Sequence, residues 1–294
     1  MKCEVCFRHC QIEEGKLGFC GGRGCKDGEI IAANYGRITS AALDPIEKKP
    51  LAMYKPGKKV LSVGSYGCNL RCPFCQNYEI SWADNVWHDA RAGLENQGLS
   101  GEGGVEVVSP DELVQMALAL RERGNIGLAF TYNEPLIGYE FVRDTAKLAH
   151  EKGLENVLVT NGTASLKVLK EIGPYMDAMN IDLKAFTDGF YRDLIQGDLD
   201  MVREFIQEAV RLCHVELTTL IIPGENDSEE EMRRLSAWVA ELDGKVPGRR
   251  IPLHVTRFFP RFHMMDRNAT EVSKVYRLAE VAREKLAYVF EGNI

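Results

Sequence analysis

The sequence has no hydrophobic run long enough to cross a membrane, and it has no excess of basic residues. Its longest mostly apolar stretch, residues 113–120, is interrupted by Gln115, whereas a membrane helix needs about 20 apolar residues. The 36 Lys and Arg residues are outnumbered by 43 Asp and Glu residues, which gives a formal net charge of −7. The sequence therefore predicts no membrane partner and argues against a nucleic-acid-binding protein.

The chain also lacks a secretory signal. It begins MKCEVCFRHC, which has neither an apolar core nor a small-residue cleavage site. We therefore expect a cytoplasmic protein, whose cysteines stay reduced. The composition is otherwise ordinary, because 45% of the 294 residues are apolar and 27% are charged. That is enough for one large α/β domain with an accessory segment.

Cysteine is unusually abundant. Nine are present, and eight of them lie within the first 75 residues. The odd count and the missing export signal argue against a disulfide framework. Clustered thiols in a reducing compartment indicate metal or iron–sulfur binding instead. Cys213 stands apart at the start of a predicted strand, and we expect it to be a buried structural residue.

Two segments of different character are predicted, divided at residue 58. Residues 1–58 form a small cysteine-rich N-terminal extension with short antiparallel strands, and its first half has too few apolar residues to build a core. Residues 59–294 alternate strands with helices, which predicts parallel strands joined by helical crossovers. The expected strands are 59–66, 126–132, 156–161, 178–184, 214–223 and 251–258.

Six strand–helix units favour an α/β fold of the incomplete (β/α)6 barrel type over a doubly wound sheet. The clearest helix follows Ser109, the predicted N-cap, with Pro110 in the first turn and Glu112 closing a capping box. Glycines and polar residues gather where the strands end, as on the active face of a barrel, although a doubly wound sheet also binds ligands there. Residues 81–108 are expected to form a lid, a binding loop or a disordered segment.

The strongest functional motif is GCNLRCPFCQN, directly after the first barrel strand. Its cysteines, Cys68, Cys72 and Cys75, have the spacing C-x3-C-x2-C. Three thiolates on one short loop converge on one point, and such soft ligands select iron–sulfur clusters, zinc or Cu(I). A [4Fe–4S] cluster held by three cysteines keeps one iron open for catalysis, whereas a structural zinc site needs a fourth ligand. The spacing favours the cluster over zinc.

With Phe74 before its last cysteine, this motif resembles that of the radical S-adenosylmethionine (SAM) superfamily. Further segments at successive strand ends resemble the glycyl-radical-enzyme activases, of which pyruvate formate-lyase activating enzyme is the best known. These segments are YNEP (132–135), LVTNGT (158–163), NIDLKAF (180–186) and IIPGENDSEEE (221–231). The chain as a whole most closely resembles the radical SAM proteins of the AmmeMemoRadiSam system, and the likeness is densest around residues 34–80.

The resemblance implies a partial barrel in which a [4Fe–4S] cluster binds SAM through its fourth iron. An external one-electron reductant, such as flavodoxin or ferredoxin, then drives cleavage of SAM to a 5′-deoxyadenosyl radical that abstracts hydrogen from a substrate. The activase-like segments imply a protein or peptide substrate, and the alternative is a small molecule covered by residues 81–108. A hypothesis from another class is a non-catalytic zinc or iron–sulfur protein that serves in electron transfer or as an interaction module.

The resemblance also implies which residues hold the ends of SAM. Glu134 would accept a hydrogen bond from the SAM amino group, and Lys184 would reach the SAM carboxylate. Asp182 would orient Lys184 or bind the ribose. Each has a structural alternative, because Glu134 could cap the next helix and Asp182 and Lys184 could form a local ion pair. One residue of the last predicted strand is expected to reach the same site: His254, Thr256 or Arg257.

The middle of SAM would meet residues from several loops. Thr160 and Asn161 stand where the resemblance places ribose contacts, and Phe74 would pack beside the adenine. Tyr132 and Asn133 replace the paired glycines of the family. At this point the resemblance no longer implies a close backbone approach to SAM, and the two side chains would contact it instead.

The N-terminal cysteines offer one thiol more than a four-coordinate site takes. Cys3 and Cys6 form one chelating pair, and Cys20 and Cys25 form a looser second pair. A structural zinc site is favoured because it would fold this core-poor segment, and an auxiliary iron–sulfur cluster is the alternative. The resemblance favours Cys3, Cys6, Cys10 and Cys20 as the ligands and leaves Cys25 optional.

Overall fold

The computed structural model describes residues 1–82, 105–246, 248 and 250–294. At its centre is an eight-stranded sheet with the strand order β12-β11-β10-β9-β8-β7-β5-β4. Every neighbouring pair from β5 to β12 is parallel, and β4 alone runs antiparallel to its neighbour β5. Among the described strands, β12 and β4 each have one neighbour, so the barrel is incomplete. The predicted α/β class is confirmed.

The parallel strands coincide with the apolar, β-branched runs of the sequence. They are β5 (Lys59–Gly64), β7 (Asn125–Phe130), β8 (Glu155–Thr160), β9 (Ala178–Asp182), β10 (His214–Ile221), β11 (Leu253–Arg257) and β12 (Val289–Gly292). The pattern misses β12, because the last expected strand is 251–258, whereas β12 follows the last helix, which ends at Arg283. Strand β4 (Ser40–Pro45) precedes residue 58 and yet pairs with β5, so the main sheet extends across the expected domain boundary.

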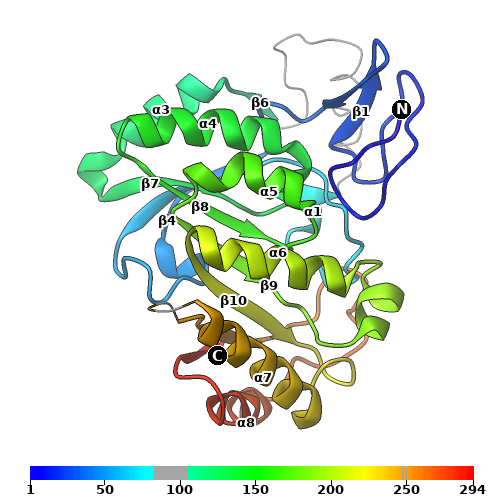
Figure 1. The fold of residues 1–294 in the computed structure, drawn as a ribbon, viewed down its shortest axis with the longest axis vertical. Coiled ribbons are helices and arrows are strands. Elements are labelled where there is room, and N and C mark those ends of the chain that lie inside the picture. The colour runs from blue at the N-terminus through cyan, green and yellow to red at the C-terminus, as the bar shows by residue number, and fades with distance from the viewer. Residues whose placement is uncertain (83–104, 247, 249) are drawn as a thin grey trace.

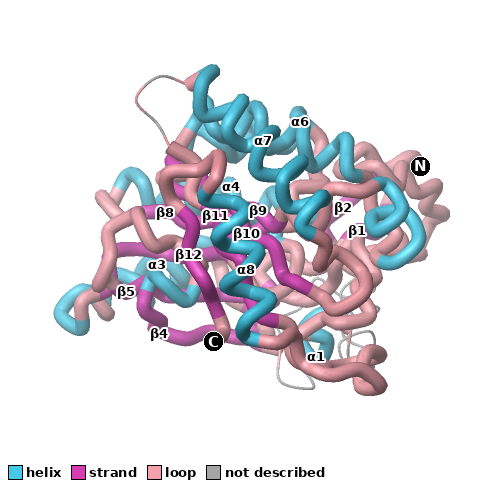
Figure 2. Tube along the Cα trace, turned by 90° about the horizontal axis from the view of Figure 1, so that it is seen from below, coloured by secondary structure: helices cyan, strands magenta, loops and turns pink. Residues whose placement is uncertain are grey.

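A helix follows each of the six strands from β5 to β11 and covers the sheet. These helices are α3 (Pro110–Ala119), α4 (Tyr139–Glu151), α5 (Leu166–Ile172), α6 (Leu199–Leu212), α7 (Glu229–Lys245) and α8 (Val272–Arg283). Figure 1 shows α3 to α6 side by side across one face of the strands, and Figure 2 shows α6 and α7 on the outer side of β9 to β11. No helix in the described ranges is long and apolar enough to cross a membrane.

Short helices lie between these elements. They are α1 (Tyr78–Ser81), the 3-10 helices η1 (Ile46–Lys48), η2 (Arg121–Arg123), η3 (Pro135–Gly138) and η4 (Gly173–Tyr175), and the π-helix η5 (Phe190–Leu194). The predicted start of α3 is confirmed: Glu112 N–H donates to Ser109 Oγ at 3.2 Å, and Ser109 N–H donates to the Glu112 carboxylate at 2.8 Å. Two N–H groups that the helix leaves free are thereby satisfied.

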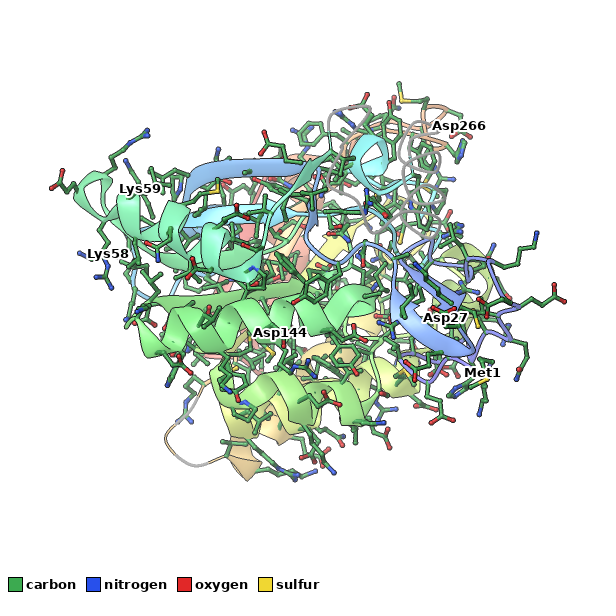
Figure 3. The ribbon with its side chains drawn as sticks, turned by 90° about the horizontal axis from the view of Figure 1, so that it is seen from above. Met1, Asp27, Lys58, Lys59, Asp144 and Asp266 are labelled. Carbon is green, nitrogen blue, oxygen red and sulfur yellow. The ribbon has the colours of Figure 1, made fainter. Side chains whose placement is uncertain are left out.

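The N-terminal segment lies against the carboxyl edge of the sheet. Its strands are β1 (Arg23–Lys26) and β2 (Glu29–Ala32), which form a hairpin, and β3 (Arg37–Ile38), which pairs with β6 (Glu106–Val107). An isolated bridge joins Cys6 to Ala164, shortly after the end of β8. Figure 3 shows the same arrangement, because Met1 and Asp27 lie at the opposite end of the molecule from Lys59, where β5 begins.

The buried carboxylate of Glu216 binds the chain segment before β5 to the middle of the sheet. Glu216 of β10 has a fully buried side chain. Its oxygens accept hydrogen bonds from the backbone N–H groups of Ala52 (2.9 Å) and Met53 (2.8 Å) and pair with Nε2 of His214 (2.9 Å) and of His254 (2.7 Å). Burial alone would raise the pKa of Glu216, but these partners outweigh it and lower the pKa to about 2.

Replacing Glu216 with Ala should therefore destabilise the protein by about 3–5 kcal/mol at neutral pH, because buried partners would lose their acceptor. Because the pKa of Glu216 is lower in the folded protein than its ordinary value of 4.5, its ionised form stabilises the fold at pH values above 4.5. This contribution is lost as the pH falls toward 2. The difference in urea unfolding free energy between wild type and Glu216→Ala should shrink over that interval. Glu204→Ala, at an exposed position of α6, is the matched control. A difference that did not change with pH would contradict the assignment.

Candidate functional site

A cavity of ≈ 780 Å³ opens where the parallel strands end. That edge is the active face of a (β/α) barrel. The structure brings all the residues predicted for the cluster and for SAM into its wall: Cys68, Cys72, Phe74, Cys75, Tyr132, Asn133, Glu134, Thr160, Asn161, Asp182 and Lys184. They come from four successive strand ends, so the topology of the sheet gathers them.

The loop after β5 presents three partly buried thiols to this cavity. Leu70 N–H donates to the sulfur of Cys68 at 3.4 Å, and Nδ2 of Asn161 lies 3.7 Å from the same sulfur. Burial raises the pKa of all three thiols, that of Cys72 to about 12. Thiolates at these positions therefore need a positively charged partner, and a metal centre that binds soft ligands fits this donor set.

The cavity around the three cysteines has room for more than a single ion. Among the described residues, the N-terminal cysteines included, no three His, Cys, Asp or Glu side chains are already arranged to hold a metal ion. A [4Fe–4S] cluster is larger than one ion, and it holds its cysteine sulfurs apart on separate irons. The wide cavity at Cys68, Cys72 and Cys75 therefore has room for a cluster.

Asn133 fixes the cysteine loop. Its Oδ1 accepts a hydrogen bond from Ser65 N–H at 3.1 Å, and its Nδ2 donates to the carbonyl oxygens of Tyr66 and Gly67, each at 3.1 Å. The side-chain amide is thus occupied by the backbone that leads into Cys68. The sequence predicts a SAM contact at Asn133, and the structure gives its side chain a supporting role beneath the loop.

Tyr132 has the left-handed backbone conformation that glycine adopts readily, with φ +75°. Its hydroxyl donates to Asp44 of β4 at 2.9 Å, and Nζ of Lys49 lies 4.7 Å from its ring centre. The tyrosine therefore keeps the turn that the family's glycine would make. It also links the end of β7 to the antiparallel edge of the sheet.

Glu134 joins the ends of β7 and β8. Its Oε1 accepts hydrogen bonds from Thr160 Oγ1 at 2.7 Å and from Leu136 N–H at 3.1 Å, and its Oε2 accepts from Asn161 N–H at 2.7 Å. The contact to Leu136 makes Glu134 the cap of η3, which was the structural alternative, and the residue lines the cavity as well. Burial raises its pKa to about 7. A cationic ligand would stabilise its ionised form.

Asp182 and Lys184 form an ion pair in the cavity wall, with Nζ 2.7 Å from Oδ2. Lys184 N–H donates to the hydroxyl of the fully buried Tyr191 at 3.0 Å, which fixes the backbone there. Burial alone would lower the pKa of Lys184, but the charge of Asp182 raises it above its ordinary value. The site therefore holds an ammonium group beside Cys72, and its positive charge offsets part of the rise that burial causes in the pKa of the Cys72 thiol.

Strands β10 to β12 line the far half of the cavity. Of the three candidates on β11, His254 and Thr256 line it, whereas Arg257 donates to the carbonyl of Thr270 at 2.7 Å. Sequence reasoning missed Thr218, which lies opposite His254 in the strand register. It also missed the β12 wall, residues 290–293. The alternation of β-branched and aromatic residues after α8 is the signal that points to β12.

The other cysteines lie elsewhere. Cys213 is buried just before β10 and borders a separate cavity of ≈ 490 Å³. Cys3, Cys6, Cys10 and Cys20 line a cavity of ≈ 10 Å³ in the N-terminal segment. Cys25 is not among its lining residues, and its thiol donates to the carboxylate of Glu14 at 3.6 Å. Of the loop expected at 81–108, residues 83–104 lie outside the described residues.

The comparisons with known proteins agree with this geometry. The model of the radical SAM superfamily matches residues 62–236. Protein MJ0808 of Methanocaldococcus jannaschii, named as uncharacterised, is 36% identical over 297 residues, which cover 100% of this chain and 81% of that protein. Pyruvate formate-lyase 1-activating enzyme of Escherichia coli is 23% identical over 194 residues, 64% of this chain and 71% of that enzyme.

A solved structure shares the fold. SuiB of Streptococcus suis superimposes with a TM-score of 0.56 at 11% sequence identity, over 79% of this chain and 48% of SuiB. At that identity the likeness concerns the fold alone. The resemblance to the AmmeMemoRadiSam proteins stays a prediction.

The raised pKa of Glu134 predicts a pH-dependent stability. Between the ordinary value of 4.5 and about 7 the folded protein keeps a proton that the unfolded chain releases, so the unfolding free energy should fall as the pH rises through this interval. In Glu134→Gln, which does not titrate, this slope should disappear, whatever the absolute stability. Urea unfolding at pH 5, 6, 7 and 8 measures it, with Glu204→Gln as the control. Equal slopes in wild type and Glu134→Gln would refute the assignment.

Proposed function

Because the chain belongs to the radical SAM superfamily, we propose that it cleaves SAM reductively at a [4Fe–4S] cluster bound by Cys68, Cys72 and Cys75. The observation that carries the proposal is the shared cavity, which places these thiols beside the buried Glu134 and Lys184. When bound, the reduced cluster supplies one electron to the sulfonium of SAM, so that the C5′–S bond breaks to give methionine and a 5′-deoxyadenosyl radical.

The donor set supports a cluster with one open iron. Three cysteines of one loop line the cavity, and the remaining six cysteines of the chain do not. The cavity volume of ≈ 780 Å³ lies within the range of cofactor and ligand sites, roughly 300–1,000 Å³. The protein thus supplies three sulfur ligands and leaves the fourth coordination position to SAM.

Glu134 and Lys184 would bind the two charged groups of the methionine part of SAM. The carboxylate of Glu134 accepts from the amino group, and the ammonium of Lys184 donates to the carboxylate. Asp182, already paired with Lys184 at 2.7 Å, holds that ammonium in place. Opposite charges on the two sides of the cavity would orient SAM before any chemistry begins, which is what catalysis by positioning requires.

The nucleoside part of SAM would lie along the remaining wall. Thr160 and Asn161 would lie against the ribose, with their side chains held in place by Glu134 and Asn69. Phe74, which is 4% exposed, would supply an apolar surface for the adenine. Tyr132 and Asn133 would shape this wall mainly through the turn that they stabilise. Their polar side-chain atoms already have partners in Asp44 and in the cysteine loop.

We further propose that the radical abstracts hydrogen from a protein or peptide, as the name of the pyruvate formate-lyase activating relatives suggests. The electron would come from an external carrier such as flavodoxin or ferredoxin. His254, Thr256 and Thr218 provide polar groups for a substrate in the half of the cavity away from Glu134. We also propose that Cys3, Cys6, Cys10 and Cys20 bind a second metal centre, either zinc or an auxiliary cluster.

The first test is production of 5′-deoxyadenosine. Protein reconstituted anaerobically with iron and sulfide should form it from SAM and dithionite. Cys72→Ala should reduce the product to the level of a blank, because the cluster loses one of its three protein ligands. Cys213→Ala, which alters a cysteine away from the cavity, is the control and should retain activity. A wild-type protein that holds a [4Fe–4S] cluster and yields no product would refute the proposal, and a colourless zinc protein would support a non-catalytic role.

Replacing Lys184 with Met should weaken SAM binding about 30-fold, the effect of about 2 kcal/mol. The substitution removes the group that binds the SAM carboxylate and leaves Asp182 unpaired, so that its charge repels the same carboxylate. Equilibrium dialysis of SAM against the reconstituted protein measures the effect. Lys170→Met, at an exposed position of α5, is the matched control. Unchanged affinity in Lys184→Met would show that the carboxylate is held by another group.

A further inference from the structure

The four N-terminal thiols are brought together by backbone bonds within a short stretch of chain. Cys3 N–H donates to the carbonyl of Cys10 at 2.9 Å, and His9 N–H donates to that of Cys6 at 3.3 Å. These bonds close a loop whose three cysteines line one cavity together with Cys20. The sulfurs of Cys6 and Cys20 also receive backbone N–H groups, from Arg8 to Cys6 and from Gly22 and Arg23 to Cys20.

The size of this cavity distinguishes between the two kinds of centre. Its volume is ≈ 10 Å³, about the space of a single water-sized sphere. The cavity around Cys68 is ≈ 780 Å³. A [4Fe–4S] cluster contains eight atoms and would require the side chains around this small cavity to move apart, whereas a single ion bound by four sulfurs at about 2.3 Å would require them to move inward.

The charged residues at the cavity also favour a single metal ion. Two guanidinium groups, those of Arg8 and Arg23, line it, and no carboxylate does. Arg23 is 4% exposed, and its Nε is a buried donor without an acceptor in the described part of the chain. The Nη1 of Arg23 already pairs with the carboxylate of Glu140 at 2.6 Å, so its charge is compensated. A zinc ion with four thiolates would carry a net charge of about −2, which Arg8 would partly balance and which would give the Nε of Arg23 a sulfur acceptor.

The same segment holds the loop that carries Cys68. Cys68 N–H donates to the carbonyl oxygen of Cys20 at 3.1 Å. A Cβ at Gly67, where φ is +86°, would lie 2.4 Å from this oxygen, so only glycine permits the approach. Asn69 bonds through its side chain to the thiol of Cys6, and its carbonyl accepts from Nε of Arg8 at 2.6 Å.

Phe19, adjacent to Cys20, extends this contact. Its ring lies between two guanidinium groups, 3.3 Å from that of Arg8 and 3.8 Å from that of Arg71. Arg71 also donates from Nη2 to the carbonyl of Phe19 at 2.7 Å. Both faces of the ring are therefore used to join the N-terminal segment to the loop 67–71.

From these contacts we propose that Cys3, Cys6, Cys10 and Cys20 bind one zinc ion as thiolates, and that this ion positions the loop carrying Cys68. The zinc site stands on its own residues, and its effect on the cluster rests on the function proposed above. The ion would hold Cys20 and Cys6, whose backbone and side chain fix residues 68 and 69. Zinc would thus act as a positioning site and take no part in electron transfer.

The test compares Cys10→Ser with Cys25→Ser. Cys10 forms no hydrogen bond with the loop 67–71 in the described structure, and Cys25 is a buried cysteine outside the cavity. Wild type and Cys25→Ser, reconstituted with iron and sulfide, should contain one zinc and four irons per chain by elemental analysis. Cys10→Ser should lose the zinc, keep the four irons initially, and lose its cluster absorbance to an iron chelator about tenfold faster. Zinc withheld from wild type during growth should give the same lability, and added zinc should reverse it.

Several outcomes would overturn the inference. Eight irons and no zinc in wild type would establish a second cluster, and no metal at the four thiols would remove the site. Loss of zinc with unchanged cluster lability would remove its positioning role. These results do not depend on SAM cleavage. A wild-type protein that holds zinc and a cluster but forms no 5′-deoxyadenosine would contradict the proposed function alone.

Discussion

Residues 133 and 134 join three neighbouring strands at the edge where the cavity opens. The amide of Asn133 holds the loop that follows β5, and the carboxylate of Glu134 accepts from Thr160 and Asn161 at the end of β8. Both residues belong to the turn after β7, so one dipeptide sets the distance between the cysteine loop and the opposite wall. Parallel strands alone do not fix their loops, because the ladder of backbone hydrogen bonds stops where each strand ends. The geometry of the site therefore depends on these side-chain bonds.

The cavity concentrates groups whose ionised forms burial disfavours. Glu134 and the three thiols all have raised pKa values, whereas Lys184 keeps its charge through Asp182. Burying these ionisable groups destabilises the protein when no ligand is bound. Groups with perturbed pKa values gathered in a cleft are typical of functional sites. Membership of the radical SAM superfamily supplies the chemical reason, since a cluster and a zwitterionic cofactor provide the charges that such a wall needs.

The sequence predicted the site better than its supporting structure. The spacing of Cys68, Cys72 and Cys75 and the positions of Glu134 and Lys184 at strand ends were enough to place them at one edge, because parallel strands end together. The role of Asn133 could not be predicted, since its partners lie 66 to 68 residues away and leave no local pattern. Strand β12 was missed because it is short and only a brief segment, residues 284–288, separates it from α8. The fully buried Glu216 sits in a mostly buried strand, and sequence alone does not show which partners compensate its charge.

The two ends of the sheet also meet the cavity. Residues 45 and 47–50, at and after the end of β4, line the same space as residues 290–293, which contain the end of β12. Yet β4 and β12 are the two edge strands of the sheet. No backbone hydrogen bond between these described strands closes the barrel. A molecule filling the cavity would touch the ends of both β4 and β12 and take the place of the missing hydrogen bonds between them. Occupancy would then stiffen the whole barrel, so that mechanical rigidity becomes a property of the loaded protein rather than of the polypeptide by itself.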